Sequence, residues 1–336
     1  MRAVIYSENG PSDVLQVVDR PIPEPGPGEV RVRMRVSGVN PTDWKVRAGT
    51  PPAFPEQVPN QDGAGVIDAV GPGVDPARVG ERVWVWLAAH QRPGGTAQEY
   101  ATLPSERAVP LPDTASFDLG ASLGVPFVTA HRTLTVNEHG PQRLAAGVLD
   151  GRCVLVAGGA GAVGNAAIQL AHWAGATVLT TVSSAEKAAL ATAAGAQHVI
   201  NYRSQDVVDE VRRIAPDGVD TIVEVSPSTN AAIDVAVLGR HGTVAIYAGK
   251  PDEELAVPLR PLMTLNARWQ FVLLYTLPEA GKVDAVAGVS AAVAAGAVDV
   301  GEQVGLPLHR FPLEQTAAAH DAVEGGAVGK VLIEIG

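Results

Sequence analysis

The sequence is poor in cysteine and in cationic residues. Cys153 is the one cysteine among 336 residues, so no intramolecular disulfide can form and a thiolate-rich structural zinc site is excluded. Lys and Arg number 25 against 36 Asp and Glu, which gives a formal net charge of -11. That balance opposes binding to a nucleic-acid backbone, which depends on cationic side chains. We therefore expect a cytoplasmic protein that binds no nucleic acid.

Long apolar segments are also missing. The longest stretch of low charge, Ala285 to Val298, contains Gly288 and Gly296 and is shorter than a bilayer span. The first residues, MRAVIYSENG, hold one basic residue and an apolar run too short for a signal sequence. The sequence thus predicts a protein that is neither exported nor anchored in a membrane.

What is present in the first third is a series of short strands. Val30, Val32, Met34 and Val36 alternate with polar residues, a period of two that buries one face of a strand. Glycines separate the later apolar runs 66–70 and 83–86. This pattern predicts a small, bent antiparallel barrel.

From about Pro126 onward, strands and helices alternate. Apolar or β-branched runs predict strands at 153–157, 177–182, 198–201, 219–225 and 243–248. Helical spacing predicts helices at 163–174, 185–194, 205–214 and 230–238. Such alternation indicates right-handed crossovers, and hence an α/β, doubly wound parallel sheet of the Rossmann type.

The alternation fades after Pro261. A strand is expected at 268–274, helices at 282–295 and 313–323, and a last strand at 330–335. We expect these elements to rejoin the N-terminal barrel. The predicted domains are therefore a discontinuous first domain, 1–125 and 262–336, and a doubly wound second domain, 126–261.

A glycine-rich turn links the first predicted strand of the second domain to its first helix. Gly158, Gly161 and Gly164 stand where glycines permit a tight turn and let backbone N–H groups approach a pyrophosphate at the positive end of a helix. The alternative is a tight turn that binds nothing. The position of this turn between a strand and a helix favours the interpretation that it binds a dinucleotide.

The choice between the two nicotinamide cofactors depends on the end of the next strand. An NAD site has a carboxylate there, whereas this sequence has Ser183 and Ser184, with Lys187 one helical turn on and Tyr202 and Arg203 after the third strand. Hydroxyl groups and cations suit a 2′-phosphate, so the sequence predicts NADPH. Two alternatives stay open, because either serine could simply cap the helix and Arg203 could be an ordinary surface residue.

Six ordered blocks match a known family: GVNPTDWKVRAG (38–49), DGAGVIDAVGPGV (62–74), LGVPFVTAHRTL (123–134), AGGAGAVGNAAIQLA (157–171), GAQHVINYR (195–203) and GKVLIEI (329–335). In these blocks the chain resembles the zinc-free quinone oxidoreductases, the zeta-crystallin-like branch of the medium-chain dehydrogenase/reductase superfamily. The resemblance implies a GroES-like catalytic domain, a Rossmann domain that binds NADPH, and a homodimer formed through the edge strand Arg268–Leu274.

The resemblance also assigns cofactor contacts. The glycine-rich turn and the ends of the later strands are expected to hold NADPH, with Lys330 from the last strand as a further contact. The residues so assigned are Thr129, Gly158, Ala160, Gly161, Ala162, Val163, Gly164, Ser183, Ser184, Lys187, Tyr202, Ser226, Ser228, Tyr247, Ala248, Gly249, Val272, Leu273, Leu274 and Lys330.

Zinc-dependent relatives carry a cysteine at the position of Asn40 and a histidine near Gln61, so no metal is predicted here. By the same resemblance the substrate pocket comprises Asn40, Trp44, Lys45, Gln61 and Tyr275. Asn40 and Lys45 are the candidate catalytic residues, because an amide or an ammonium could bind the substrate oxygen. Asn40 could instead bond the backbone of its loop, and Lys45 could be solvated.

With a hydride donor, no zinc and no nucleophile, the expected substrate is a quinone or an enone, in which a double bond is conjugated to a carbonyl group. One alternative is reduction of an enoyl thioester such as an acrylyl-CoA. Another, of a different class, is an NADPH-binding crystallin-like or RNA-binding protein without reductase activity. The one dense basic run, Arg31, Arg33 and Arg35, alternates along a strand and gives that last alternative little support.

Overall fold

The protein is described by a computed structural model, in which residues 1–250 and 252–336 are placed. The chain divides into two compact units, Met1–Val125 with Pro307–Gly336, and Pro126–Leu306. The predicted boundary at 261/262 is therefore wrong, because residues 262–306 belong to the second unit. Strand β13 (Arg268–Phe271) pairs in parallel with β12 (Leu238–Ile246), and helix α9 (Glu279–Ala294) packs on α3 (Val128–Leu134).

The first unit is built on a bent, mostly antiparallel sheet. Its order is β14-β15-β3-β4-β5-β7, and β6 also pairs with β3. The strands are β3 (Glu29–Val39), β4 (Asp62–Val70), β5 (Arg82–Val85), β6 (Tyr100–Pro104), β7 (Ala108–Pro110), β14 (Leu308–Pro312) and β15 (Lys330–Glu334), beside a separate pair, β1 (Arg2–Ile5) and β2 (Gln16–Asp19).

Two register shifts bend β3 against β4, one between Arg31 and Val32 and one between Met34 and Val36. Each shift raises the local twist and lets the sheet curl over its own apolar face. At Gly65 a Cβ would lie 2.2 Å from the backbone oxygen of Arg33, so the curl needs glycine there. The core inside the bend includes Val30, Val32 and Ile67, all fully buried.

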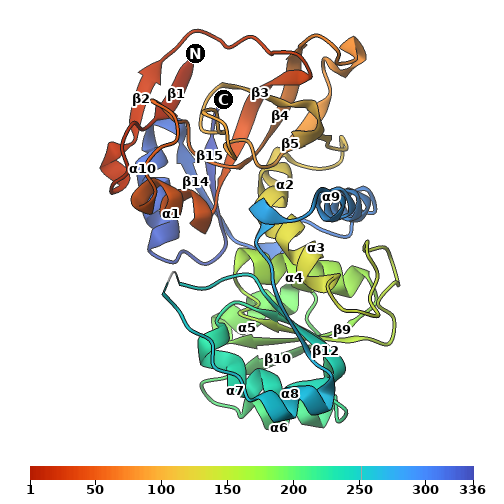
Figure 1. Cartoon of the computed structure of the whole chain (residues 1–336). Helices are drawn as coiled ribbons and strands as arrows, with labels where there is room; N and C mark the ends of the chain where they lie inside the picture. The colour runs from red at the N-terminus through yellow and green to blue at the C-terminus, as the bar shows by residue number, and fades with distance from the viewer. Residues whose placement is uncertain (251) are drawn as a thin grey trace. The chain divides into compact units, whose positions relative to one another are not determined.

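A strand from the first part of the chain and the C-terminal strand are neighbours in this sheet. Strand β15 pairs antiparallel with β3, with Leu332 opposite Gly38 (Figure 1). Gly38 also lies against helix α2 (Phe117–Ser122), where a Cβ would come within 2.0 Å of the Ala121 oxygen. The C-terminal segment therefore completes the first unit, together with helix α10 (Thr316–Glu324).

Residues 41–49 form a helix, α1 (Pro41–Gly49), where the sequence suggested a loop. Asn40 is its N-cap residue and Pro41 occupies the first helical position. The backbone N–H of Asn40 donates to Asp43 Oδ2 at 2.7 Å, and the backbone N–H of Asp43 donates to the backbone carbonyl oxygen of Asn40 at 3.0 Å. This reciprocal bonding satisfies the first turn and explains why the segment is helical.

The described residues of the second unit form a six-stranded parallel sheet of order β10-β9-β8-β11-β12-β13. Besides β12 and β13, its strands are β8 (Cys153–Ala157), β9 (Thr177–Val182), β10 (His198–Asn201) and β11 (Val219–Glu224). Numbered along the chain, the order is 3-2-1-4-5-6, so the direction of winding reverses between β8 and β11. The predicted doubly wound fold is confirmed.

Helices cover both faces of this sheet. Helices α3, α4 (Ala162–Trp173) and α9 contact one another on one face, and α6 (Val207–Ile214) packs with α7 (Pro227–Val237) on the other (Figure 1). Helices α5 (Ala185–Ala193) and α8 (Leu259–Leu265) also belong to the second unit. The predicted helices match α4 to α7 within three residues, whereas α2, α3 and α8 were not predicted. Within the described residues, none of the helices has the length and apolar character needed to cross a bilayer.

Candidate functional site

The predicted cofactor residues of the second unit gather at one edge of its sheet. Gly158, Ser183 and Tyr202 follow β8, β9 and β10, while Ser226 and Tyr247 follow β11 and β12. Because all neighbouring strands are parallel, their carboxyl ends meet at the same edge. Thr129, which was also predicted in this unit, lies in α3 and is buried.

The glycine-rich turn is shaped by two different requirements. Gly158 has φ +69°, a conformation that favours glycine. Gly164 lies in the first turn of α4, where a Cβ would approach the Gly158 oxygen within 2.4 Å. Gly161 is the N-cap of α4 and offers no side chain to the first N–H groups of the helix. Those N–H groups are therefore left for an anionic ligand.

The serine pair after β9 divides into two roles. Ser184 is the N-cap of α5, and its hydroxyl accepts the Lys187 N–H at 3.3 Å. Ser183 and the Lys187 side chain are half-buried, and Tyr202 is 52% exposed. The alternative that a serine caps the helix thus applies to Ser184, which leaves Ser183, Lys187 and Tyr202 at the corner expected for a 2′-phosphate.

The end of β11 carries a buried pair of carboxyl groups that the sequence reasoning did not single out. Glu224 and Asp234 are 0% and 1% exposed. Glu224 accepts the Ser226 N–H and two bonds from Asn230 Nδ2, at 3.0 and 3.1 Å. Burial, then the Glu224 charge, raises the pKa of Asp234 to about 8, so at neutral pH Asp234 holds a proton and donates it to Glu224.

Signals for this pair existed in the sequence. Glu224 is a charged residue at the end of an apolar strand, and Asp234 lies between Ala231 and Val237 on the buried face of α7. By bonding the Ser226 N–H, Glu224 fixes the turn that begins α7. Ser228, two residues on, donates to Glu253, so its hydroxyl already has a protein partner.

The remaining predicted contacts follow β12 and β13. Tyr247 and Ala248 are half-buried and Gly249 is exposed. Val272 continues the pairing of β13, because its N–H donates to the Ile246 oxygen at 2.7 Å. Val272 and Leu274 are buried, whereas Leu273 is 53% exposed.

A second polar cluster lies in the first unit, around Asn40. Lys330 Nζ donates to Asn40 Oδ1 at 2.7 Å, and Asn40 Nδ2 donates to Asp62 Oδ2 at 2.7 Å. Asp62 also accepts the Val125 N–H, at 3.0 and 2.9 Å from its two oxygens. Lys330 is therefore held by first-unit side chains, and these contacts do not support its expected role in binding the cofactor.

This cluster buries three charged groups together. Lys330 Nζ lies 3.8 Å from Asp62 Oδ2, and both side chains are about 1% exposed or less. Burial raises the pKa of Asp62 and lowers that of Lys330, while the attraction between the two charges opposes both shifts. Burial, then the Asp62 charge, raises the pKa of Asp43 to about 7. Removing one partner of such a group leaves a buried charge uncompensated.

The other predicted pocket residues are less constrained. Lys45 is exposed, with its Nζ 5.9 Å from the centre of the Trp44 ring. Gln61 is half-buried, and its Oε1 accepts no hydrogen bond from the described residues. Tyr275 is half-buried in the second unit. The structure thus brings Asn40 together with Asp62 and Lys330, and leaves Lys45 available to solvent.

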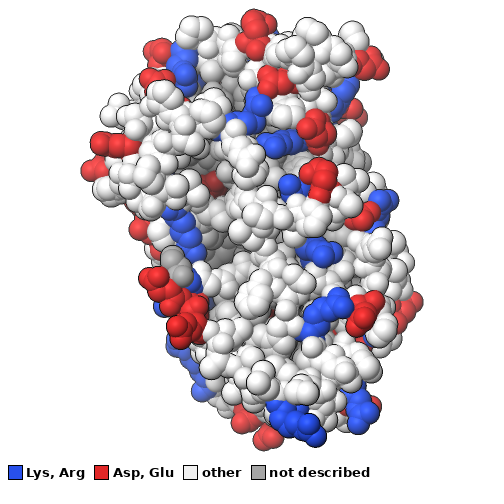
Figure 2. Space-filling view, in the orientation of Figure 1, with Lys and Arg blue, Asp and Glu red and all other residues white. Residues whose placement is uncertain are grey.

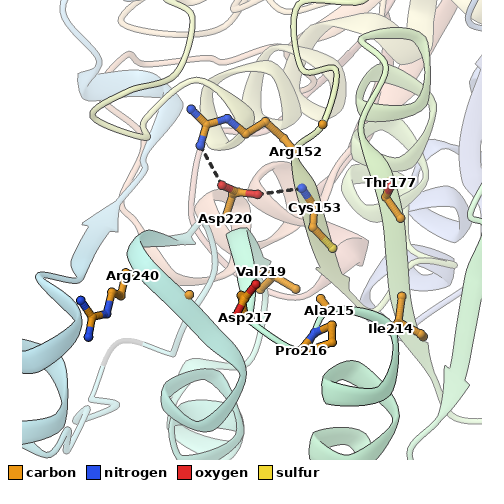
Figure 3. Close-up of a pocket in the computed structure, with 13 residues that line it drawn as sticks. Arg152, Cys153, Thr177, Ile214, Ala215, Pro216, Asp217, Val219, Asp220 and Arg240 are labelled. Carbon is orange, nitrogen blue, oxygen red and sulfur yellow. Dashed lines mark hydrogen bonds and ion pairs between the residues drawn. The ribbon is translucent and has the colours of Figure 1, made fainter.

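A separate pocket of about 560 Å³ opens at the opposite edge of the parallel sheet (Figure 3). It is lined by the amino ends of β8, β9 and β11, including Cys153, Thr177 and Val219. There Asp220 accepts the Cys153 N–H at 2.8 Å and pairs with Arg152 at 2.7 Å. In doubly wound folds ligands bind at the carboxyl ends of the strands, so this pocket is not the cofactor site.

Comparison with known proteins identifies the family. The Alcohol dehydrogenase GroES-like domain family matches residues 26–113, and the Zinc-binding dehydrogenase family matches 162–297. The quinone oxidoreductase of Lama guanicoe is 32% identical over 340 residues, which cover 99% of this chain and 97% of that protein. This chain belongs to the quinone oxidoreductase, zeta-crystallin-like family. The human quinone oxidoreductase is 31% identical over the same shares.

Solved structures of related proteins share the fold of this chain. The Escherichia coli quinone oxidoreductase complexed with NADPH superimposes with a TM-score of 0.80 at 25% identity, over 99% of this chain and all of that one. A protein described as an NAD-dependent alcohol dehydrogenase gives a TM-score of 0.83 at 28% identity over both full chains. The fold therefore accommodates both reactions, and the site residues must distinguish them.

The buried carboxyl pair predicts how stability of this family member changes with pH. The pKa of Asp234 is raised from 3.8 to about 8, so between these values the folded chain retains a proton that the unfolded chain has lost. The contribution to stability is complete below pH 4 and is lost as the pH rises toward 8. From pH 6 to pH 8 we expect a loss of about 1–2 kcal/mol in the free energy of unfolding.

The variant Asp234→Asn keeps a neutral donor for Glu224, so this part of the pH dependence should disappear. Urea unfolding at pH 6 and pH 8 measures the difference between wild type and variant, with Asp217→Asn, an exposed position, as the matched control. Equal pH slopes for wild type and Asp234→Asn would show that the pair does not share a proton.

Proposed function

We propose that this chain is an NADPH-dependent oxidoreductase that reduces quinones and, by the same conjugated-carbonyl chemistry, enones. The observation that carries the proposal is the full-length similarity to quinone oxidoreductases, at 32% identity over 99% of the chain. The glycine-rich turn at the reversal point of the sheet supports it, because that is where this fold binds dinucleotides.

The residues present fit a dinucleotide. A Cβ at Gly164 would fill the space beside the Gly158 oxygen, and the start of α4 has no side-chain cap. Ala162 and Val163, the first residues of α4, would hold the diphosphate through their backbone N–H groups. When bound, NADPH supplies a hydride.

A 2′-phosphate is favoured over a free ribose diol. In the described part of the chain, β9 ends at Val182 and is followed by serines, with no carboxylate at its tip. Ser183 and Lys187 would bind the phosphate, and Tyr202 would lie beside them. The E. coli relative was solved with NADPH, which supports the same choice here.

The residues do not fit a catalytic zinc ion, although one matching family is described as zinc-binding. Asn40 and Gln61 are amides, which are poor zinc ligands, and the Lys330 ammonium 2.7 Å from Asn40 would repel a cation. Among the described residues, no three His, Cys, Asp or Glu side chains are grouped so as to hold a metal. We therefore propose a zinc-independent reaction.

In such a reaction the protein must bind the substrate oxygen with hydrogen-bond donors, because that oxygen gains negative charge. Asn40 is the buried donor among the predicted pocket residues, and Lys45 is the exposed one. Gln61 offers its side-chain amide. The final proton can come from water, which reaches Lys45.

Consumption of NADPH tests the proposed function. We expect absorbance at 340 nm to fall with 1,2-naphthoquinone or 1,4-benzoquinone, and more slowly with a cyclic enone. An enoyl-CoA and a primary alcohol with NADP+ serve as the comparison substrates, because they represent thioester reduction and alcohol oxidation. Tight NADPH binding without turnover of any acceptor would contradict the proposal and favour a binding protein.

The cofactor preference depends on Lys187. Replacing it with alanine removes a cation from the 2′-phosphate corner, so we expect affinity for NADPH to fall about 10-fold while affinity for NADH is unchanged. Fluorescence titration measures both. The matched control is Arg240→Ala, which removes an exposed cation at the opposite edge of the sheet. If Lys187→Ala and the control behave alike, Lys187 does not bind the phosphate.

We also propose a cytoplasmic homodimer that pairs through β13. This strand is the last in the sheet order of the described residues, so one of its backbone edges is open there. Phe271 on β13 is 64% exposed, and the preceding helix α8, which packs on β12, exposes Met263 (66%) and Leu259 (75%). An open apolar edge favours pairing with a second copy of the same edge. In the face shown in Figure 2, basic and acidic side chains are interspersed, which does not favour a nucleic-acid partner.

Phe271→Asp tests this edge. Two carboxylates would face each other across a symmetric contact, so the mass in solution should fall from twice 34.7 kDa to 34.7 kDa. Light scattering after gel filtration measures it. Val17→Asp changes a 43% exposed valine on β2 in the same way and should leave the mass unchanged. A dimer that survives Phe271→Asp would place the contact elsewhere.

A further inference from the structure

The amide of Asn40 is held between a buried cation and a buried anion. Lys330 Nζ donates to its Oδ1 and Asp62 Oδ2 accepts from its Nδ2, both at 2.7 Å. These partners fix which way the amide points, since a flip would set its NH2 against an ammonium and its oxygen against a carboxylate. The three side chains are each 2% exposed or less.

One hydrogen of this amide remains unused. Nδ2 carries two hydrogens, and among the described residues Asp62 is its one acceptor. A cation on the oxygen of an amide and an anion on one N–H polarise the group, which makes the second N–H a stronger donor. A buried N–H without an acceptor is unfavourable, so a ligand oxygen that accepts it gains a bond the protein does not supply.

We propose that Lys330 and Asp62 are positioning residues that orient and polarise Asn40, so that its free N–H binds the carbonyl oxygen of the acceptor. This inference rests on the proposed function. It names Lys330 and Asp62 as the residues that orient the Asn40 N–H, the donor to the substrate oxygen. It differs from the expectation that Lys330 binds the cofactor.

The surroundings keep this arrangement rigid. Asp43, from the first turn of α1, accepts the Asn40 N–H at 2.7 Å. Val125 donates its N–H to Asp62, and a Cβ at Gly124 would lie 2.1 Å from Asp62 Oδ1, so glycine lets the chain approach the carboxylate. A donor fixed before the substrate arrives needs no reorganisation when charge develops on the oxygen.

The charges around Asn40 also favour this role. The groups that face it are the Lys330 ammonium from β15, the Asp62 carboxylate at the start of β4, and Asp43 from α1. Burial lowers the pKa of Lys330, but both carboxyl groups raise it and thereby favour the charged ammonium. A neutral lysine would no longer polarise the Asn40 amide, and Lys330→Met reproduces that loss of charge.

Lys330→Met removes the charge and keeps a long side chain, while Lys330→Arg keeps the charge. We expect Lys330→Met to lower kcat for quinones about 10–100-fold, with a smaller change in KM, because the bond strengthens as charge develops. Its Kd for NADPH should stay within about 2-fold, and Lys330→Arg should restore part of kcat. Ser37→Ala, a buried hydroxyl in the same unit, is the control for lost stability.

A second readout does not depend on turnover. In ¹H–¹⁵N spectra of the NADP+-bound protein, the Asn40 side-chain signals are assigned by their loss in Asn40→Asp. Duroquinone, which does not react with NADP+, should shift one Nδ2 proton in wild type and not in Lys330→Met. If Lys330→Met does not fold, Asp62→Asn takes its place and should likewise lower kcat.

Two results would overturn the inference. One is a Kd for NADPH at least 10-fold weaker in Lys330→Met with kcat unchanged, which would make Lys330 a cofactor contact. The other is an Asn40 amide that duroquinone does not shift. If wild type reduces no acceptor, the proposed function fails, and the duroquinone titration alone decides whether Asn40 binds the oxygen.

Discussion

The hydrogen bond from Lys330 to Asn40 joins the last strand of the chain to the start of α1, and the first unit depends on it. An ammonium with 1% exposure must be compensated, and its partners come from two separate segments. Asp62 begins β4 and Asn40 caps α1, while Lys330 itself begins β15. Because the cation is unfavourable without them, the cluster requires these segments to meet. The same requirement that closes the fold also orients the amide next to the predicted substrate pocket.

The second unit is organised by a different constraint, the parallel pairing of its strands. Parallel order places the carboxyl ends of neighbouring strands at one edge, so residues distant in sequence, such as Gly158 and Tyr247, lie at the same edge. This is why the Rossmann fold could be predicted from sequence. The apolar runs, the helical spacing and the glycine turn are local patterns, and the topology follows from their alternation.

What failed to follow from sequence depends on pairing over long distances or on burial of charge. Nothing local in residues 268–294 tells whether that strand extends the second sheet or returns to the first, so the boundary at 261 was wrong. Asn40 and Pro41 look like a turn until Asp43 is seen to bond the Asn40 N–H. From its place in the sequence Lys330 was expected to contact the cofactor, because its burial next to Asp62 depends on a residue far away in the chain.

Both units bury two carboxyl groups close together, and they neutralise them by different means. In the first unit an ammonium lies beside Asp62, with Asp43 nearby, so part of the negative charge is balanced at any pH at which Lys330 stays charged. In the second unit Glu224 and Asp234 have no cation among the groups that shift the pKa of Asp234, and a shared proton takes that role. In the first unit the compensating charge is thus a side-chain ammonium next to Asp62, whereas in the second unit it is a proton held by Asp234 that is lost as the pH rises. Because Glu224 holds the turn that begins α7 through the Ser226 N–H, loss of the Asp234 proton at alkaline pH leaves two buried negative charges beside that turn.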